Sequence, residues 1–139
     1  MIRDIIKEDI KYIYKLVDSF DNNFKQIYNL EGYINKKDYI LKCYAINKQI
    51  VGFIIGILID KEYDLEYVFV DSLFRKKGIA TKLINSIVED KKISRIVLEV
   101  SDNNKKAINL YKKLGFSVIN KREKYYKDGS NALLMELII

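Results

Sequence analysis

The chain of 139 residues contains no histidine, no tryptophan and no proline, and it has a single cysteine. Without histidine, imidazole cannot serve as a general base, a metal ligand or a pH switch. The lone cysteine, Cys43, excludes an internal disulfide and a metal site built from several cysteines. We expect Cys43 to be a small residue of the core, and the sequence predicts no metal site.

A long apolar stretch is absent too. The longest such run, residues 50–59, has ten residues, which is too short to span a bilayer as a helix and is typical of a buried strand. The first nine residues mix both charges and lack the apolar core of a signal peptide. We therefore expect a cytoplasmic protein without a membrane partner.

The composition is typical of a soluble protein with one domain, residues 1–139. Hydrophobic residues make up 49% and charged residues 32% of the chain, which argues against disorder. The net charge of +6 is uneven: residues 1–60 hold 9 basic and 8 acidic side chains, and residues 61–139 hold 16 basic and 11 acidic. An anionic partner is thus expected to meet the second half, although charge alone favours a merely soluble surface.

Hydrophobic periodicity and turn residues predict a mixed α/β protein. Residues 20–31 are expected to be irregular or to form a short second helix. Helices are expected over residues 4–18, 79–91 and 103–114, and strands over 39–47, 49–59, 63–70, 95–100, 116–122 and 131–138. Because helices and strands alternate along the second half, a central sheet with helices on both faces is expected.

A basic segment with a glycine, residues 71–78, lies between a predicted strand and a predicted helix. Backbone N–H groups at such a helix start point at one spot, and the helix dipole adds positive potential there. Gly78 and Ala80 keep side chains away from an approaching anion. Three consecutive residues add charge: Arg75, Lys76 and Lys77. The segment predicts a pyrophosphate cradle without the Walker signature, and a solvated basic turn is the alternative.

One acidic residue, Glu99, interrupts an apolar strand. Strand alternation puts Val97 and Glu99 on one face, opposite Ile96 and Leu98. If helices cover both faces, Glu99 lies in an apolar setting, where burial raises the pKa and suits a general base. The alternative is a carboxylate that reaches solvent at the end of the strand, and without context this alternative is favoured.

The next predicted helix carries a polar and aromatic stripe, because Asn104, Ala107, Ile108 and Tyr111 share one face. Ser101 or Asp102 is expected to cap this helix. Asn104 can meet a ligand from the first turn, and Tyr111 can donate its hydroxyl proton at the far end. The alternative is a core tyrosine whose hydroxyl binds a backbone carbonyl.

The order and spacing of these motifs resemble the GNAT acetyltransferase superfamily over nearly the whole chain. Residues 75–80 fit R/Q-x-x-G-x-G/A, and Leu98-Glu99-Val100, Asn104 and Leu110-Tyr111-x-x-Leu114-Gly115-Phe116 follow in order. The tail, residues 122–135, is similar to the R-x-x-Y-Y…D-G…A-x-x-M segment of protein N-terminal acetyltransferases, and of the RimI-type ribosomal-protein-alanine N-acetyltransferases in particular.

The resemblance implies the GNAT fold, a central mixed and mostly antiparallel sheet flanked by helices, and an enzyme that uses acetyl-CoA as donor without a metal. The acceptor it implies is the N-terminal α-amino group of a protein, in particular a small-subunit ribosomal protein, acetylated by direct transfer. Glu99 is implied as general base, Tyr111 as general acid, and Tyr125 and Tyr126 as the lining of the peptide groove. The implied cofactor-binding residues are Phe69, Val70, Arg75, Lys76, Lys77, Gly78, Ile79, Ala80, Thr81 and Asn104, with Phe69 and Val70 pairing by backbone with the pantetheine arm.

Three alternatives stay open. Asp64 and Glu66 lie on one strand face, and either could be the base, because other GNAT members use an acid on this strand. The acceptor could be a small-molecule amine or a lysine side chain. A non-catalytic RNA or ribosome-surface binder is disfavoured, because the sequence has no zinc site, RNP-like motif or long basic arm, so no direct nucleic-acid binding is expected.

Overall fold

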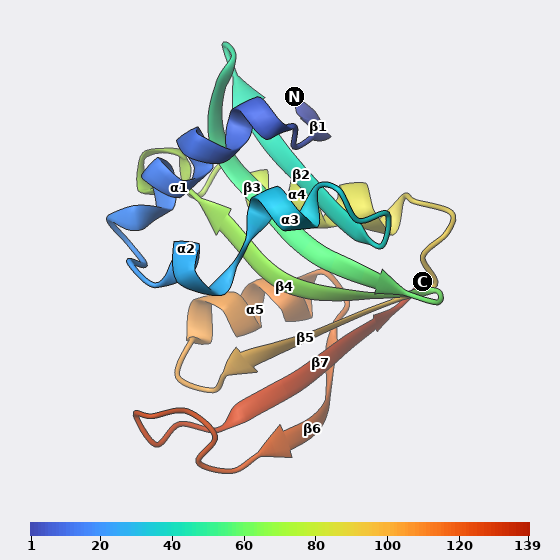
Figure 1. The fold of residues 1–139 in the computed structure, drawn as a ribbon. Helices are drawn as coiled ribbons and strands as arrows, with labels where there is room; N and C mark the ends of the chain where they lie inside the picture. The colour runs from blue at the N-terminus through green and yellow to red at the C-terminus, as the bar shows by residue number, and fades with distance from the viewer.

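Seven strands form one sheet in the computed structural model, which describes all 139 residues (Figure 1). The strand order is β1-β2-β3-β4-β5-β7-β6, and every neighbouring pair is antiparallel except β4 and β5. The strands are β1 (Ile2–Asp4), β2 (Tyr39–Ile46), β3 (Gln49–Ile59), β4 (Glu62–Val70), β5 (Arg95–Ser101), β6 (Ser117–Arg122) and β7 (Ala132–Ile138). The sheet is therefore mixed and mostly antiparallel, as the sequence predicts.

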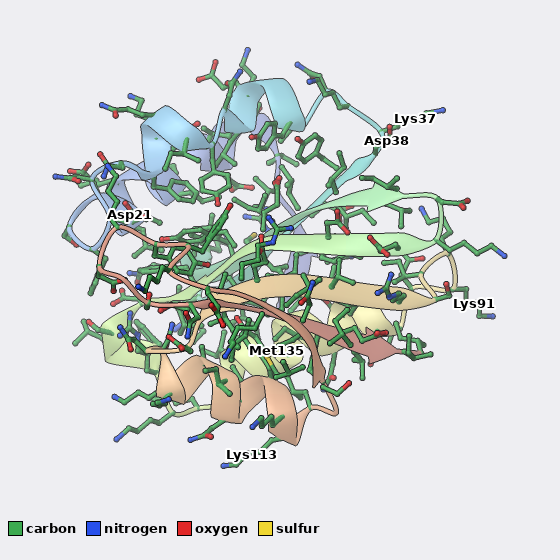
Figure 2. The ribbon with its side chains drawn as sticks, turned by 90° about the horizontal axis from the view of Figure 1, so that it is seen from below. Asp21, Lys37, Asp38, Lys91, Lys113 and Met135 are labelled. Carbon is green, nitrogen blue, oxygen red and sulfur yellow. The ribbon has the colours of Figure 1, made fainter.

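Helices cover both faces of this sheet (Figure 2). They are η1 (Lys7–Asp9), α1 (Ile10–Asp18), α2 (Phe24–Ile27), α3 (Leu30–Tyr33), η2 (Ser72–Phe74), α4 (Ile79–Val88) and α5 (Lys105–Lys113). One buried cluster joins α1–α3 to β2, β3 and the end of β4, and a second joins α4 and α5 to the other face. The expected fold class is confirmed. No helix is long and apolar enough to cross a membrane.

The first predicted helix is too long at its start. Residues 2–4 form an edge strand on β2, and α1 begins only at Ile10. The cause is a local network: the guanidinium of Arg3 donates to both carboxylate oxygens of Asp9, at 2.7 and 2.9 Å, and the Ile6 N–H donates to the same carboxylate. This network holds the chain in a turn before α1. Cys43 is fully buried on β2, as expected.

The sheet opens between β4 and β5. These parallel strands pair only over 62–64 with 95–97. In β4 a bulge follows, because Gly56 of β3 pairs with Leu65 and Ile55 with Tyr67, which leaves Glu66 without a partner. A bulge bends its strand, so β4 diverges from β5 beyond this point. The opening lies at the centre of the sheet, at the one parallel pair.

Candidate active site

The loop from β4 to α4 presents a row of unused backbone donors. Gly78 has φ +76°, a left-handed conformation that favours glycine, and no side chain caps the helix after it. None of the seven N–H groups from Arg75 to Thr81 donates a hydrogen bond within the protein. A Cβ built on Gly78 would meet no atom within 4 Å, so the space beside Gly78 is open. Together they can accept an anion.

The side chains of this loop divide into two groups. Lys76 and Lys77 are exposed beside the free amides, whereas Ile79 is buried, so that only its N–H faces the loop. Ala80 and Thr81 are half-buried in the first turn of α4. The ammonium groups of the two lysines can therefore add to the positive potential of the amides.

Arg75 lies differently from its two lysine neighbours. Its Nε donates to the Val70 carbonyl at 2.9 Å. Its guanidinium carbon lies 5.4 Å from the centre of the Phe20 ring and 5.9 Å from that of Phe69. The side chain thus braces the end of β4 against the segment after α1, while its backbone N–H stays available with the others.

The free edge of β4 corrects one expectation. The Asp71 N–H donates to the Val51 carbonyl at 2.8 Å. Because the groups of an antiparallel strand alternate in direction, the backbone of Phe69 also faces β3, and that of Val68 and Val70 faces the opening. The expectation that Phe69 offers its backbone to the pantetheine arm is therefore wrong. Val68, which the sequence analysis missed, has this property, and only the register reveals it.

Two cavities meet at the opening. The smaller, about 390 Å³, is lined by Val68, Val100, Asn104, Tyr111 and Tyr126 among others. The larger, about 630 Å³, lies against α2 and α3, and Tyr28 and Tyr33 form part of its wall. Four residues line both cavities: Leu65, Glu66, Leu98 and Glu99. Two ligands that enter from these two sides would meet beside the carboxylates of Glu66 and Glu99.

Glu99 is not buried among apolar side chains; it reaches solvent, which is the alternative that the sequence alone favours. The residue is exposed, and its Oε2 lies 3.3 Å from Nε of Arg122. The reason is that α1–α3 pack on β2, β3 and the end of β4 and leave this part of β5 uncovered. Glu99 instead stands at the junction of the two cavities.

Asp64 on β4 is half-buried, whereas Glu66 is exposed, as Glu99 is. Partial burial of its carboxyl group raises the pKa of Glu66. Burial and the neighbouring Glu62 raise the pKa of Asp64 to about 6, and its Oδ1 is buried without a hydrogen-bond partner. Glu62 is paired with Arg95 and Glu99 with Arg122, but Asp64 and Glu66 have no cationic partner. The larger cavity therefore carries uncompensated negative charge, which favours a cationic ligand.

Tyr111 of α5 reaches the smaller cavity with a free hydroxyl. The residue is buried and packs against Phe116, with ring centres 5.6 Å apart. Its hydroxyl makes no hydrogen bond in the protein, so the alternative of a carbonyl-bound core tyrosine does not hold. Burial raises the pKa of Tyr111 to about 12. The group is protonated at neutral pH and can donate that proton.

Asn104 is the residue that caps α5, in place of the expected Ser101 or Asp102. Its Oδ1 accepts from the Ala107 N–H at 3.2 Å. The amide nitrogen of its side chain has no partner in the protein and lies at the smaller cavity.

The two loop tyrosines differ in position. Their rings stand edge to face, with centres 5.1 Å apart. Tyr126 lines the smaller cavity, and its pKa is raised first by burial and then by the charge of Glu99. Tyr125 is 53% exposed and lies under the guanidinium of Arg122. The structure thus brings Tyr126 to the opening and leaves Tyr125 at the rim.

A second pair of tyrosines, which the sequence analysis missed, forms the opposite wall. Tyr28 comes from residues 20–31, expected to be irregular or a short helix, and Tyr33 is the last residue of α3, just beyond that segment. The Tyr28 hydroxyl donates to the Glu66 carbonyl at 3.3 Å, which ties this wall to the bulge. Their aromatic side chains were a signal, but no sequence spacing connects them to β4.

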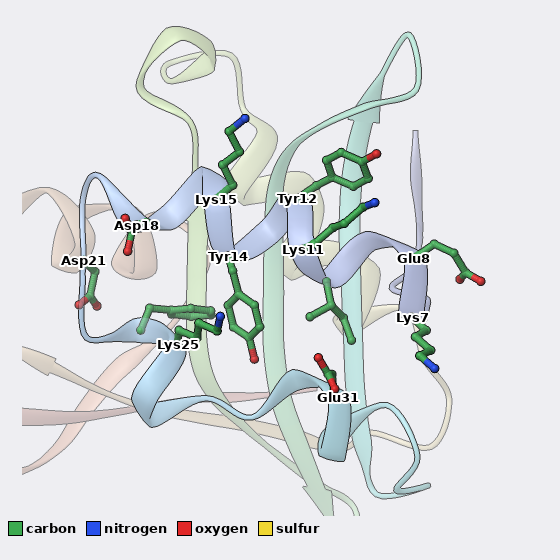
Figure 3. A pocket seen from close by; sticks show the side chains of 12 residues that line it. Lys7, Glu8, Lys11, Tyr12, Tyr14, Lys15, Asp18, Asp21, Lys25 and Glu31 are labelled. Carbon is green, nitrogen blue, oxygen red and sulfur yellow. The ribbon is translucent and has the colours of Figure 1, made fainter.

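A larger hollow of about 1000 Å³ lies along α1 (Figure 3). Its lining alternates lysines with acids, and Lys15 and Tyr12 point away from Tyr14 (Figure 3). No set of groups converges on one point there, so the opening between β4 and β5 is the better candidate site.

Comparison with known proteins agrees with this geometry. The acetyltransferase (GNAT) family matches residues 7–116. The ribosomal protein bS18-alanine N-acetyltransferase of Haemophilus ducreyi is 29% identical over 151 residues, covering all of both chains. An N-alpha-acetyltransferase of Sulfurisphaera tokodaii is 41% identical over 66 residues, which are 45% of this chain and 40% of that protein.

Solved structures give the same result. Ard1 from Thermoplasma volcanium superposes with a TM-score of 0.84 at 28% identity, covering 100% of this chain and 97% of the other. Several curated relatives match over only 21% to 53% of their own length. The matched residues 7–116 include the loop before α4, the opening and Tyr111. The chain belongs to the acetyltransferase (GNAT) family.

Proposed function

We propose that this chain transfers the acetyl group of acetyl-CoA directly to the N-terminal α-amino group of a protein. A ribosomal protein is the acceptor class we favour, since the full-length relative from Haemophilus ducreyi carries that activity in its name. The observation that carries the proposal is the pair of cavities that meet at Glu66 and Glu99, with open amides on one side and unpaired carboxylates on the other.

The donor side is supported by the loop. The free N–H groups from Arg75 to Thr81, with Lys76 and Lys77, would hold the diphosphate of acetyl-CoA. The open backbone edge at Val68 and Val70 would pair with the pantetheine arm, and the free amide of Asn104 would add a contact beside it. Arg75 would have to release the Val70 carbonyl for that pairing.

The chemistry then needs protons to leave the acceptor nitrogen and one proton to reach the departing sulfur. Glu99, through a water molecule, takes a proton from the acceptor ammonium, and the neutral amine attacks the thioester carbonyl. The nitrogen of the adduct releases its second proton to solvent, the carbon–sulfur bond breaks, and Tyr111 gives its proton to the departing thiolate. Solvent then returns a proton to Tyr111. A backbone N–H near Val70 stabilises the oxyanion in between. No covalent enzyme intermediate and no metal take part.

Glu66 is the second candidate base, because it lines the same junction and its carboxylate has no cationic partner. The comparison of Glu99→Gln with Glu66→Gln decides between them. We expect Glu99→Gln to lower kcat by about 10²-fold and Glu66→Gln to act mainly on the KM of the acceptor. The opposite ranking would move the base to β4.

The acceptor is tested with three substrates and mass spectrometry. One is a peptide with a free N-terminal alanine, the second is the same peptide with a blocked N-terminus and internal lysines, and the third is a small polyamine. We expect acetylation of the first alone, on the α-amine. The polyamine is the second candidate acceptor, because the unpaired charges of Asp64 and Glu66 also fit a compact polycation; its preference would refute the peptide assignment.

A further inference from the structure

The loop between β6 and β7, residues 123–131, is held by hydrogen bonds to one short segment of the chain. Every hydrogen bond that leaves this loop ends on residues 101–103, the turn between β5 and α5. The two loops lie side by side at the end of the sheet where β5 points (Figure 1). The turn follows Glu99 and precedes Asn104. These hydrogen bonds therefore connect the wall of the smaller cavity that carries Tyr126 to the wall that carries Glu99 and Asn104.

Asp102 and Asn131 form the centre of this hydrogen-bond network. The Asp102 N–H donates to the Asn131 carbonyl at 3.0 Å, and the Asn131 N–H donates back to Oδ1 of Asp102 at 3.1 Å. The side-chain amide of Asn131 donates to Oδ2 of Asp102 at 2.8 Å. Both carboxylate oxygens are therefore used by one residue of the other loop.

The side-chain oxygen of Asn131 connects this contact to the segment that carries the two tyrosines. Its Oδ1 accepts from the Lys124 N–H at 3.0 Å, and Lys124 has φ +49°, a left-handed conformation. Such a conformation is unfavourable for lysine and persists where neighbouring contacts hold it. Tyr125 and Tyr126 follow directly, so the amide of Asn131 fixes the direction in which they leave the chain.

A second set of contacts supports the first. Ser130 is buried, and its hydroxyl accepts from that of Ser101 at 2.8 Å. Asp128 accepts from the Ser130 N–H and hydroxyl, at 2.9 and 2.6 Å, and these bonds lower its pKa. Asn103 also donates to Asp128, at 3.4 Å.

We propose that Asp102 and Asn131 are positioning residues that determine the use of extended peptide acceptors. They hold Tyr126 beside Glu99, where the two cavities meet, and Tyr125 beside Arg122, which lines the larger cavity. The loop thus forms a fixed wall at the rim of the acceptor side, along which a peptide backbone can lie. An acceptor that offers little beyond its amine does not reach this wall and does not need it. This inference rests on the proposed function.

The test exchanges the side chains of Asp102 and Asn131. Asn131→Asp places a second carboxylate against Asp102 and removes the amide donor, and the pair Asp102→Asn with Asn131→Asp restores a donor and an acceptor in reversed order. Asn109→Asp, an exposed position on α5, is the control for the change of charge. The readouts are KM and kcat for a ten-residue peptide and for a dipeptide, and amide hydrogen exchange of residues 123–131.

We expect Asn131→Asp to raise the KM of the long peptide about tenfold, with kcat and the dipeptide KM nearly unchanged, and the exchanged pair to restore it. Exchange in the loop should speed up in the single variant and slow again in the pair. An equal loss for both acceptors, or no rescue, would overturn the positioning role. A wild-type protein that acetylates neither peptide would refute the proposed function instead, while the exchange data would still report whether the pair holds the loop.

Discussion

Tyr111 is the residue whose environment fits its proposed role most closely. Its ring is packed against Phe116, but its hydroxyl bonds to nothing in the protein and lies at the smaller cavity. A Tyr111→Phe change therefore keeps the packing and removes only the proton donor. We expect kcat to fall about 10²-fold at an unchanged Tm and an unchanged Kd for acetyl-CoA.

The matched control for this change is Tyr12→Phe, because Tyr12 is 59% exposed on α1. Steady-state kinetics and calorimetry measure both variants. Full turnover of Tyr111→Phe would show that the thiolate leaves without help from this group.

Asp64 makes stability depend on pH. Because burial raises its pKa from 3.8 to about 6, the native state disfavours the charged carboxylate and loses stability as the pH rises through 6. The variant Asp64→Asn does not titrate. We expect it to melt at a higher temperature than the wild type at about pH 8, and the advantage to vanish below about pH 4.

Thermal melts across this pH range check the prediction, with Asp60→Asn as the control at an exposed turn. A difference in Tm that is constant with pH would contradict the titration of Asp64.

At the scale of elements, the loop before α4 depends on the left-handed conformation of Gly78. Alanine there is strained by about 1–2 kcal/mol, and its Cβ would occupy open space beside the loop. We expect Gly78→Ala to weaken acetyl-CoA binding about tenfold by calorimetry. Gly129→Ala is the matched control, since Gly129 also has a positive φ and open space but lies in the β6–β7 loop. Equal affinities in the two variants would contradict a cradle at Gly78.

Gly56 lies opposite the bulge in β4 and against the ring of Tyr63. A Cβ at this position would collide with the ring of Tyr63, which is fully buried and donates to the Ile40 carbonyl at 3.0 Å. We expect Gly56→Ala to lower the free energy of unfolding by about 1–3 kcal/mol, measured in urea. The cost should shrink in a Tyr63→Leu background, where the ring is absent; an undiminished cost would place its origin elsewhere.

Local patterns predicted most of the elements because each has its own signal. The alternation of residues 95–100 and the spacing of Ile10, Ile13 and Val17 are such signals, and β5 and α1 follow them. The strand at residues 2–4 has too few residues for a pattern. It exists because Arg3 reaches Asp9 and because β2 offers a free edge, both of which are tertiary contacts.

Prediction of the site from the sequence stops at the same kind of contact. The motif spacing placed Glu99, Asn104 and Tyr111 around one opening, but the sequence could not show that α1–α3 leave Glu99 uncovered. Nor could it show that Val68, and not Phe69, has a free backbone, since that depends on the register with β3. Contacts between segments distant in the chain decide these points.

For the whole molecule, the two helical layers and the opening between β4 and β5 separate the proposed acetyl-CoA side from the proposed acceptor side. The proposed function requires the amides of residues 75–81 to receive the diphosphate of coenzyme A. The direct measurement is a titration of the isotope-labelled protein with coenzyme A, followed by backbone amide NMR. We predict saturable shifts centred on residues 75–81 and extending to Val68 and Val70. Shifts confined to the hollow along α1, or no shifts at all, would contradict a coenzyme A site at residues 75–81.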